Sequence, residues 1–347
     1  MKRILVAWLA LALALWIPSA NAEQTQGAVV GQVTNGTPGG GSVADLEVTL
    51  RILTNQGAAE TLSARTDAEG RFRFEGVPKG PETRYMAQVS YQDVIYSSSL
   101  PAFEPEQNEI TTTVTVYETT TDKEHIRTAR AHLLLNAHEG SLVVTEMHVL
   151  DNAGDRTYIG TEELEGRRWV SRFWLPQGIR ALTFEDGTLG GRFLAIAGGF
   201  VDAEPLWPGR TSVVFSYILD CGGQGCDLGR DLTWPIENLN VLLPARGMQI
   251  LSDQVRYEST LEAQGREFAN YVGRNLATGT RLALRVRLGD DGSTPLTGAQ
   301  TRAPSVLWLG LLGLVALVAL GYPFWKRRLS GEGADKARDR GKPLKRA

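Results

Sequence analysis

Short runs of alternating apolar and polar residues, separated by turn residues, dominate the 347-residue chain between residues 23 and 288. In the segment "LEVTLRIL", apolar side chains occupy every second position, at Leu46, Val48, Leu50 and Ile52. That spacing buries one face of a β-strand. Gly, Pro, Asn and Asp separate the runs, and signals for helices are nearly absent. The pattern predicts an all-β structure over this part of the chain.

One charged stretch could be mistaken for an active site. Residues 64–78, "ARTDAEGRFRFEGVP", contain Asp67, Glu69, Arg71, Arg73 and Glu75. Phe72 and Phe74 alternate with the charged residues, so the apolar and the charged side chains fall on opposite faces of a strand. Asp67 and Gly70 are typical turn residues. We therefore expect a β-hairpin whose charges lie in water.

Four segments, taken in order, resemble a carboxypeptidase regulatory-like domain at residues 24–118. They are "GQV" (31–33), "ADLEVTL" (44–50), "TDAEGRFRFEGVP" (66–78) and "YMAQVSYQDVIY" (85–96). The resemblance implies a small seven-stranded β-sandwich of transthyretin-like topology, with a role in stability or interaction and not in catalysis. The zinc-ligand spacing of the peptidase itself, H-x-x-E with a distant His, does not occur in the sequence.

The second half of the exterior repeats the β pattern. Residues 127–152 predict a hairpin that turns near Glu139 and Gly140. The tract "PLWPG" (205–209), followed by a strand, is similar to a pattern in bacterial membrane-anchored envelope proteins. The fold class expected from the sequence is all-β, with two consecutive β-sandwich domains at 23–122 and 123–288. A flexible linker follows at 289–304.

The two ends of the chain predict its place in the cell. Residues 1–22 have a basic start, a short apolar run and the ending Ala20-Asn21-Ala22, which is typical of a cleaved signal peptide; an uncleaved anchor is the alternative. Residues 305–325 carry no charge over the length of a transmembrane helix. Amphipathic rings stand near both ends of this segment, and a basic tail (326–347) follows it. The membrane-interface residues are Trp308, Tyr322, Trp325, Lys326, Arg327 and Arg328. The chain is predicted to be a single-pass cell-membrane protein with a cytoplasmic tail and an extracytoplasmic bulk.

The net charge of the predicted exterior restricts the classes of partner that it can bind. The whole chain carries −3, the signal peptide +2 and the tail +6, which leaves −11 for residues 23–325. Nucleic acid is excluded as a partner of an acidic exterior, because neutralising phosphates supplies most of that affinity. The membrane and another envelope protein are the expected partners, and a glycan is a further candidate.

Cys221 and Cys226 are the only cysteines, and they enclose "GGQG". Outside the cytoplasm such a pair is expected to form a disulfide at a hairpin tip. A redox-active pair is the alternative, although its usual signature has two intervening residues at the start of a helix.

All four histidines (His125, His132, His138 and His148) fall within 24 positions of one another. If the hairpin turns as expected, His132 and His148 could face one another beside Glu146 and hold a metal ion. Histidines scattered over a wet strand face are the commoner occurrence.

The sequence identifies no catalytic residue and no cofactor. It contains no G-x-S-x-G elbow, P-loop or dinucleotide-binding glycine pattern. A sugar-binding platform could use Trp169, Trp174, Trp207 and Trp234, although such rings more often fill sandwich cores. The sequence therefore predicts a non-enzymatic, membrane-anchored binding or scaffold protein that is accessory to another envelope protein or complex. Carbohydrate or cell-wall binding is the alternative.

Overall fold

The computed structural model describes residues 26–54, 59–138, 140–221, 225–263 and 265–288. Every regular element within these residues is a β-strand, which confirms the all-β prediction for this part of the chain. Among the described residues no helix is long and apolar enough to span a membrane. The predicted signal peptide, linker, transmembrane segment and tail lie outside the described residues.

The chain forms two compact units that are interleaved along the sequence. Of the described residues, the first unit takes in those up to Arg127, together with Val149–Phe173 and Gly187–Ser212. The second unit contains Thr128–His148, Trp174–Asp186 and the described residues between Val213 and Leu288. The boundaries expected from the sequence, including the one between residues 122 and 123, stay predictions.

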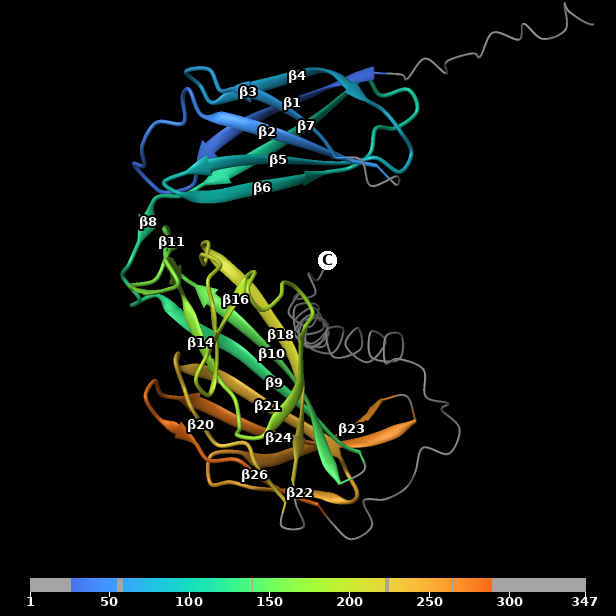
Figure 1. Cartoon of the computed structure of the whole chain (residues 1–347), viewed down its shortest axis with the longest axis vertical. Helices are drawn as coiled ribbons and strands as arrows, with labels where there is room; N and C mark the ends of the chain where they lie inside the picture. Colours follow the sequence, from blue (N-terminus) through green and yellow to red (C-terminus); the bar gives the residue numbers. More distant parts are fainter. Residues whose placement is uncertain (1–25, 55–58, 139, 222–224, 264, 289–347) are drawn as a thin grey trace, which may run out of the picture. The chain divides into compact units, whose positions relative to one another are not determined.

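The N-terminal part of the first unit is a sandwich of two sheets (Figure 1). One sheet has the order β4-β1-β7 and the other the order β3-β2-β5-β6. β1 pairs with β4 in antiparallel fashion and with β7 in parallel fashion. The strands are β1 (Gln26–Asn35), β2 (Glu47–Leu53), β3 (Ala59–Arg65), β4 (Arg71–Pro78), β5 (Arg84–Tyr91), β6 (Val94–Leu100) and β7 (Glu109–Val116).

Strict alternation of side chains builds the core of this sandwich. Phe72 and Phe74 are buried, whereas Arg71, Arg73 and Glu75 are exposed, as the sequence predicted. The expected hairpin was wrong, however. β3 pairs only with β2, and β4 pairs only with β1, so the turn at 66–70 carries the chain from one sheet to the other. Asp67 holds this turn because its carboxylate accepts hydrogen bonds from the backbone N–H groups of Glu69 and Arg71.

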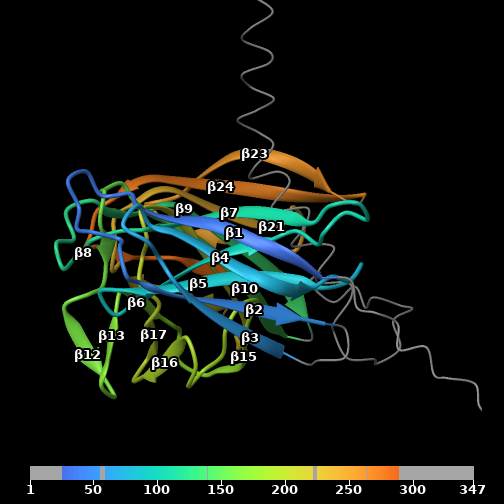
Figure 2. The same ribbon diagram turned by 90° about the horizontal axis from the view of Figure 1, so that it is seen from above.

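Short strands complete the first unit. β8 and β11 form a parallel pair, and β14, β16 and β17 form a sheet of order β14-β17-β16. β12 and β13 form a hairpin, which is labelled in Figure 2. Ile159 and Trp207, both distant in sequence, pack against the core of the N-terminal sandwich. The strands are β8 (Thr119–Thr120), β11 (Thr157–Tyr158), β12 (Glu162–Leu164), β13 (Arg167–Trp169), β14 (Ser171–Trp174), β16 (Phe193–Ile196) and β17 (Gly199–Asp202).

A seven-stranded sheet forms the framework of the second unit, in the order β15-β18-β10-β9-β21-β24-β23. β9 and β10 are neighbours, and the chain turns between His138 and Ser141, close to the expected position. The strands are β9 (Ile126–His138), β10 (Ser141–Asn152), β15 (Ile179–Phe184), β18 (Gly209–Asp220), β21 (Ile236–Pro244), β23 (Arg256–Ala263) and β24 (Arg266–Leu276).

Two small sheets supply the opposing layer of the second unit. Their orders are β19-β26-β22 and β20-β25. Leu228, Leu282, Leu284 and Val286 of this layer are buried. Arg230 of β20 reaches Glu146 of β10, which shows that the small layer faces the large sheet. The strands are β19 (Cys226–Asp227), β20 (Arg230–Asp231), β22 (Met248–Leu251), β25 (Arg281–Leu282) and β26 (Arg285–Leu288).

Candidate functional site

A cluster of ionisable side chains lies inside the core of the second unit. The Glu146 side chain is fully buried, and Nη1 of Arg230 donates to its Oε1 at 2.5 Å and to its Oε2 at 2.6 Å. The Tyr217 hydroxyl donates to Oε1 at 2.8 Å, and Nε2 of His148 lies 2.9 Å from Oε2. We call these four residues the Glu146 cluster.

The strand pattern explains how the cluster is assembled. Leu142, Val144, Glu146, His148 and Leu150 occupy one face of β10, and all five are buried. Tyr217 stands on the neighbouring strand β18, while Arg230 comes from the opposing layer. The His148 ring stacks on Phe215 at a centroid distance of 5.7 Å. Glu146 thus lies in a mostly apolar row of β10, and its partners Tyr217 and Arg230 come from two other strands.

The electrostatics keep the carboxylate charged. Burial alone would raise the pKa of Glu146, but the Arg230 charge and the His148 contact outweigh it and hold the pKa at about 2. Burial and the adjacent carboxylate raise the pKa of Tyr217 well above its usual value. At neutral pH the cluster is thus a carboxylate–guanidinium pair with a neutral phenol. A buried charge is tolerated only when it is paired and hydrogen-bonded in this way.

The cluster is built for cohesion and not for turnover. Glu146 accepts from Arg230 and Tyr217 and contacts His148, so its oxygens are occupied by protein groups. A general acid or base must reach a substrate atom, and Glu146 has no exposed surface. Two nitrogens of Arg230, Nε and Nη2, are buried and find no hydrogen-bond partner among the described residues.

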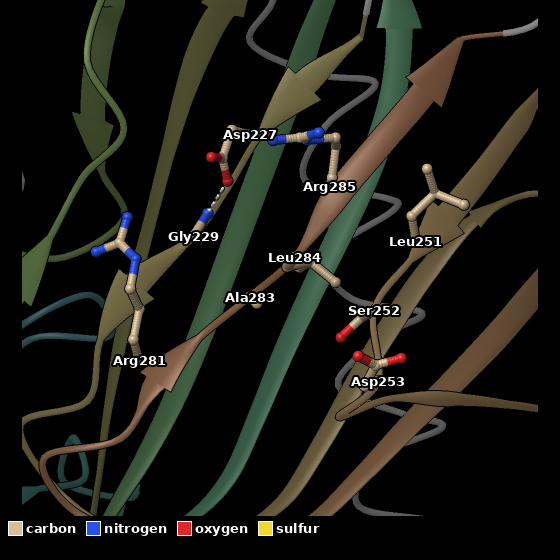
Figure 3. A pocket seen from close by; sticks show the side chains of 9 residues that line it. All are labelled: Asp227, Gly229, Leu251, Ser252, Asp253, Arg281, Ala283, Leu284 and Arg285. Atoms are coloured by element: carbon tan, nitrogen blue, oxygen red, sulfur yellow. Dashed lines mark hydrogen bonds between the residues drawn. The ribbon is translucent and has the colours of Figure 1, made fainter.

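A surface hollow of about 360 Å³ lies over the small layer of the second unit (Figure 3). Arg281 and Arg285 line it together with the carboxylates of Asp227 and Asp253. The Asp227 carboxylate is engaged by the backbone N–H of Gly229 at 2.7 Å, and Arg281 lies 3.5 Å from Asp231. Charges of both signs line an open surface, so the hollow does not select an anion or a cation.

A second hydrogen-bonded carboxylate anchors loops in the first unit. Glu118 accepts from the backbone N–H of Gly41 at 2.8 Å, from the Tyr91 hydroxyl at 2.7 Å and from Nδ2 of Asn35 at 3.0 Å. These hydrogen bonds, that of Gly41 first, lower the pKa of Glu118 to about 2. The donors come from three separate segments, so this carboxylate fixes their arrangement.

The predicted disulfide between Cys221 and Cys226 is confirmed. Both cysteines are buried, and they connect the end of β18 to the start of β19. The bond thereby joins the large sheet to the opposing layer just ahead of Arg230.

The metal site that the sequence left open at His132 and His148 stays a prediction. His148 is held by Glu146 in the core, and His132 lies beside Asn240 of β21. His125 is exposed. Within the described ranges, no group of three or more His, Cys, Asp or Glu side chains is placed to hold a metal ion.

The four candidate tryptophans of a sugar platform occupy different settings. Trp234 is buried, and Trp207 packs on Tyr96 with ring centroids 5.4 Å apart. Trp169 is half-buried beneath the Arg172 guanidinium, and Trp174 is also half-buried. No Trp is among the large hydrophobic side chains exposed in the described part of the chain. The predicted membrane-interface residues, from Trp308 to Arg328, lie outside the described residues.

Sequence reasoning missed most of the Glu146 cluster. In the sequence, Glu146 stands out only as a neighbour of a candidate metal site, and nothing singles out Arg230 or Tyr217. The available signal was a Glu at a core-facing position of an alternating strand, because such a residue requires a buried cationic partner.

Comparisons with known proteins give no family for this chain. No family model matches it, and no curated protein matches it. Solved structures similar to it include the major pilin SpaD of Corynebacterium diphtheriae, with 10% identity, 75% of this chain and 82% of that chain covered, and a TM-score of 0.22. The pilin BcpA of Bacillus cereus has 10% identity, coverages of 77% and 96%, and a TM-score of 0.19. RrgB of Streptococcus pneumoniae has 11% identity, coverages of 76% and 62%, and a TM-score of 0.20. These values are too low to transfer a fold or a function.

Proposed function

We propose that this chain is a membrane-anchored, extracytoplasmic binding or scaffold protein, accessory to another envelope protein. The observation that carries the proposal is the all-β architecture of the described residues, in which the fully buried Glu146 carboxylate is committed to cohesion of the core. Strand edges and loops remain as the means of contact with other molecules, and β-sandwiches bind through both.

Two further observations support the predicted location. The disulfide of Cys221 and Cys226 is typical of an oxidising compartment outside the cytoplasm. The uncharged segment at 305–325 and the basic tail at 326–347 favour anchoring in the cell membrane with the tail inside. The resemblance of residues 24–118 to a carboxypeptidase regulatory-like domain agrees with a role in interaction.

Cross-linking in intact cells, followed by mass spectrometry, tests the proposal. The full chain should give one defined envelope partner, and a chain ending at residue 303 should lose or weaken it. A matched control keeps the anchor but replaces residues 305–325 with an unrelated apolar helix. Retention of the partner in that control assigns the contact to the exterior, and loss assigns it to the membrane segment. Recovery of the full chain in the cell-wall fraction without a protein partner would overturn the proposal.

A further inference from the structure

β6 is an edge strand with backbone groups directed away from its sheet. In the order β3-β2-β5-β6 it has a single neighbour, β5. The two strands are joined by a two-residue turn in which both Gln92 and Asp93 have positive φ angles, near 50° and 61°. In such a hairpin the pair that flanks the turn, Tyr91 and Val94, is hydrogen-bonded. Successive residue pairs along the two strands then alternate between non-hydrogen-bonded and hydrogen-bonded.

This alternation identifies the groups at the open edge. Val94, Tyr96, Ser98 and Leu100 use their N–H and C=O groups toward β5, whereas Ile95, Ser97 and Ser99 direct theirs outward. Among the described residues, no backbone hydrogen bond outside the strand ladders involves these three residues. The nearby strand β7 is contacted from the inner face, where Ser98 Oγ lies 2.9 Å from Thr112 Oγ1. The contact with β7 therefore leaves the edge groups unused.

β6 lacks the protection that the other edge strands of the N-terminal sandwich and of the seven-stranded sheet carry, whereas the uncharged edges β16 and β22 are only four residues long. Natural sheets keep edges from pairing by means of charges, Pro or bulges. β6, with the sequence "VIYSSSL", has none of these. The other edges of the two sandwich sheets and of the seven-stranded sheet carry Glu60 and Arg65 on β3, Arg71, Arg73 and Glu75 on β4, Glu109 on β7, Arg180 and an irregularity on β15, and Arg256, Glu258 and Glu262 on β23.

The exposed side chains of β6 add an apolar contact. Ile95 is 62% exposed, more than any other large hydrophobic residue in the described part of the chain. Ser97 and Ser99 are small and exposed on the same face. A strand laid against this edge therefore meets one apolar side chain and two hydroxyls.

We propose that the edge of β6 pairs in antiparallel fashion with β6 of a second copy of this chain. With Ser97 at the two-fold axis, Ile95 lies opposite Ser99 of the partner. All three positions present the outward N–H and C=O groups that an antiparallel ladder needs. The strand carries no charge, so self-pairing places no like charges opposite one another, which is the condition that a symmetric contact must meet. The two four-stranded sheets then form one continuous sheet.

This contact goes beyond the proposed accessory role, because it concerns self-association and not the partner protein. A single strand pair buries less surface than a stable soluble dimer requires. Anchoring in a membrane raises the effective concentration of the two copies, which makes a small interface sufficient.

A single cysteine tests the register directly. Paired residues at such a site have Cα atoms about 5.5 Å apart, within the range of a disulfide. The full chain carrying Ser97→Cys should form a disulfide-linked homodimer in intact membranes under mild oxidation. The matched control is Ser63→Cys, because Ser63 is also exposed and lies on β3, the opposite edge of the same sheet. It should stay monomeric.

A second pair of variants tests the association without cross-linking. Ser97→Lys places two positive charges at the axis and should abolish Förster transfer between labelled copies of the full chain reconstituted together in lipid vesicles, whereas Ser63→Lys should leave the transfer intact. Equal cross-linking of the two cysteine variants would overturn the proposal, as would a chain that is monomeric throughout. A linked product containing a different polypeptide would also overturn it and assign the edge to a partner strand.

Discussion

Two oppositely charged residues in the core of the second unit depend on one another for their stability. Glu146 and Arg230 compensate one another, so removing one charge leaves the other buried and unpaired. We expect Glu146→Gln to lower the free energy of unfolding by about 3–5 kcal/mol. Thermal unfolding of the full chain in detergent measures this loss.

Two controls separate charge from packing. Glu162→Gln alters an exposed carboxylate and should change stability by no more than about 0.5 kcal/mol. The double variant Glu146→Leu with Arg230→Met should recover most of the loss, because no buried charge remains. If the double variant were as unstable as Glu146→Gln, the loss of stability would come from altered packing of the cluster and not from an unpaired buried charge.

His132 gives a second prediction at the residue scale. Burial, with the charge of Arg130 and then that of His148, lowers the pKa of His132 to about 4 from an ordinary value of 6.5. Between pH 6.5 and pH 4 the His132 imidazole is protonated in the unfolded chain but neutral in the folded chain. The free energy of unfolding therefore falls as the pH decreases from 6.5 toward 4. The loss amounts to about 1 kcal/mol per pH unit.

Removing the imidazole should remove that slope. Unfolding of His132→Leu, measured at pH 7, 6 and 5, should show less dependence on pH than the unaltered chain. His125→Leu is the matched control, because His125 is exposed, and it should keep the slope. An unchanged slope in His132→Leu would contradict the assignment.

At the scale of elements, the disulfide bond connects two layers through a very short loop. The cysteines are five positions apart, with Cα atoms separated by 4.6 Å. A loop of this size restricts the unfolded chain by about 2 kcal/mol in the chain-entropy model. The double variant Cys221→Ser with Cys226→Ser should therefore unfold at a lower temperature but still fold.

Comparing the double variant with the reduced native protein checks this prediction. Both should lose the same amount of stability, since each lacks only the covalent link. A loss of more than about 5 kcal/mol would mean that the bond also positions Arg230 for its contact with Glu146.

The strands show what the sequence could and could not reveal. Alternation at Phe72 and Phe74 correctly predicted which side chains are buried, because burial in a strand is a local property. The same alternation could not tell that β4 pairs with β1 and not with β3, since pairing depends on distant strands. Arg230 was missed for the same reason. It stands 84 positions from Glu146, in a segment without periodicity.

At the scale of the whole molecule, interleaving of the units limits where the chain can be divided. The N-terminal sandwich receives Trp207 against its core, and Tyr96 bonds Thr157 at 2.8 Å between their side-chain oxygens. An isolated fragment of residues 23–122 lacks both partners. It should be less stable than the same sandwich in the full chain by roughly 2 kcal/mol, the worth of a large buried side chain.

Thermal unfolding of the fragment beside the full chain measures this difference. Trp207→Ala in the full chain should reproduce part of it, because it removes one of the two partners. A fragment as stable as the intact sandwich would show that residues 149–173 and 187–212 do not stabilise the N-terminal sandwich.

Interleaving also sets the order in which the protein can be completed as it is synthesised. The first unit takes in residues up to Ser212, so its N-terminal sandwich lacks the packing of Trp207 until more than half of the chain has emerged. Glu146 appears 84 positions before Arg230, an interval of about 4–17 s at ordinary rates of synthesis. During that time β10 holds an uncompensated carboxylate and cannot close its core. Arrival of Arg230, four positions after the second cysteine, is thus a precondition for closing this core, which β21, β23 and β24 complete only afterwards.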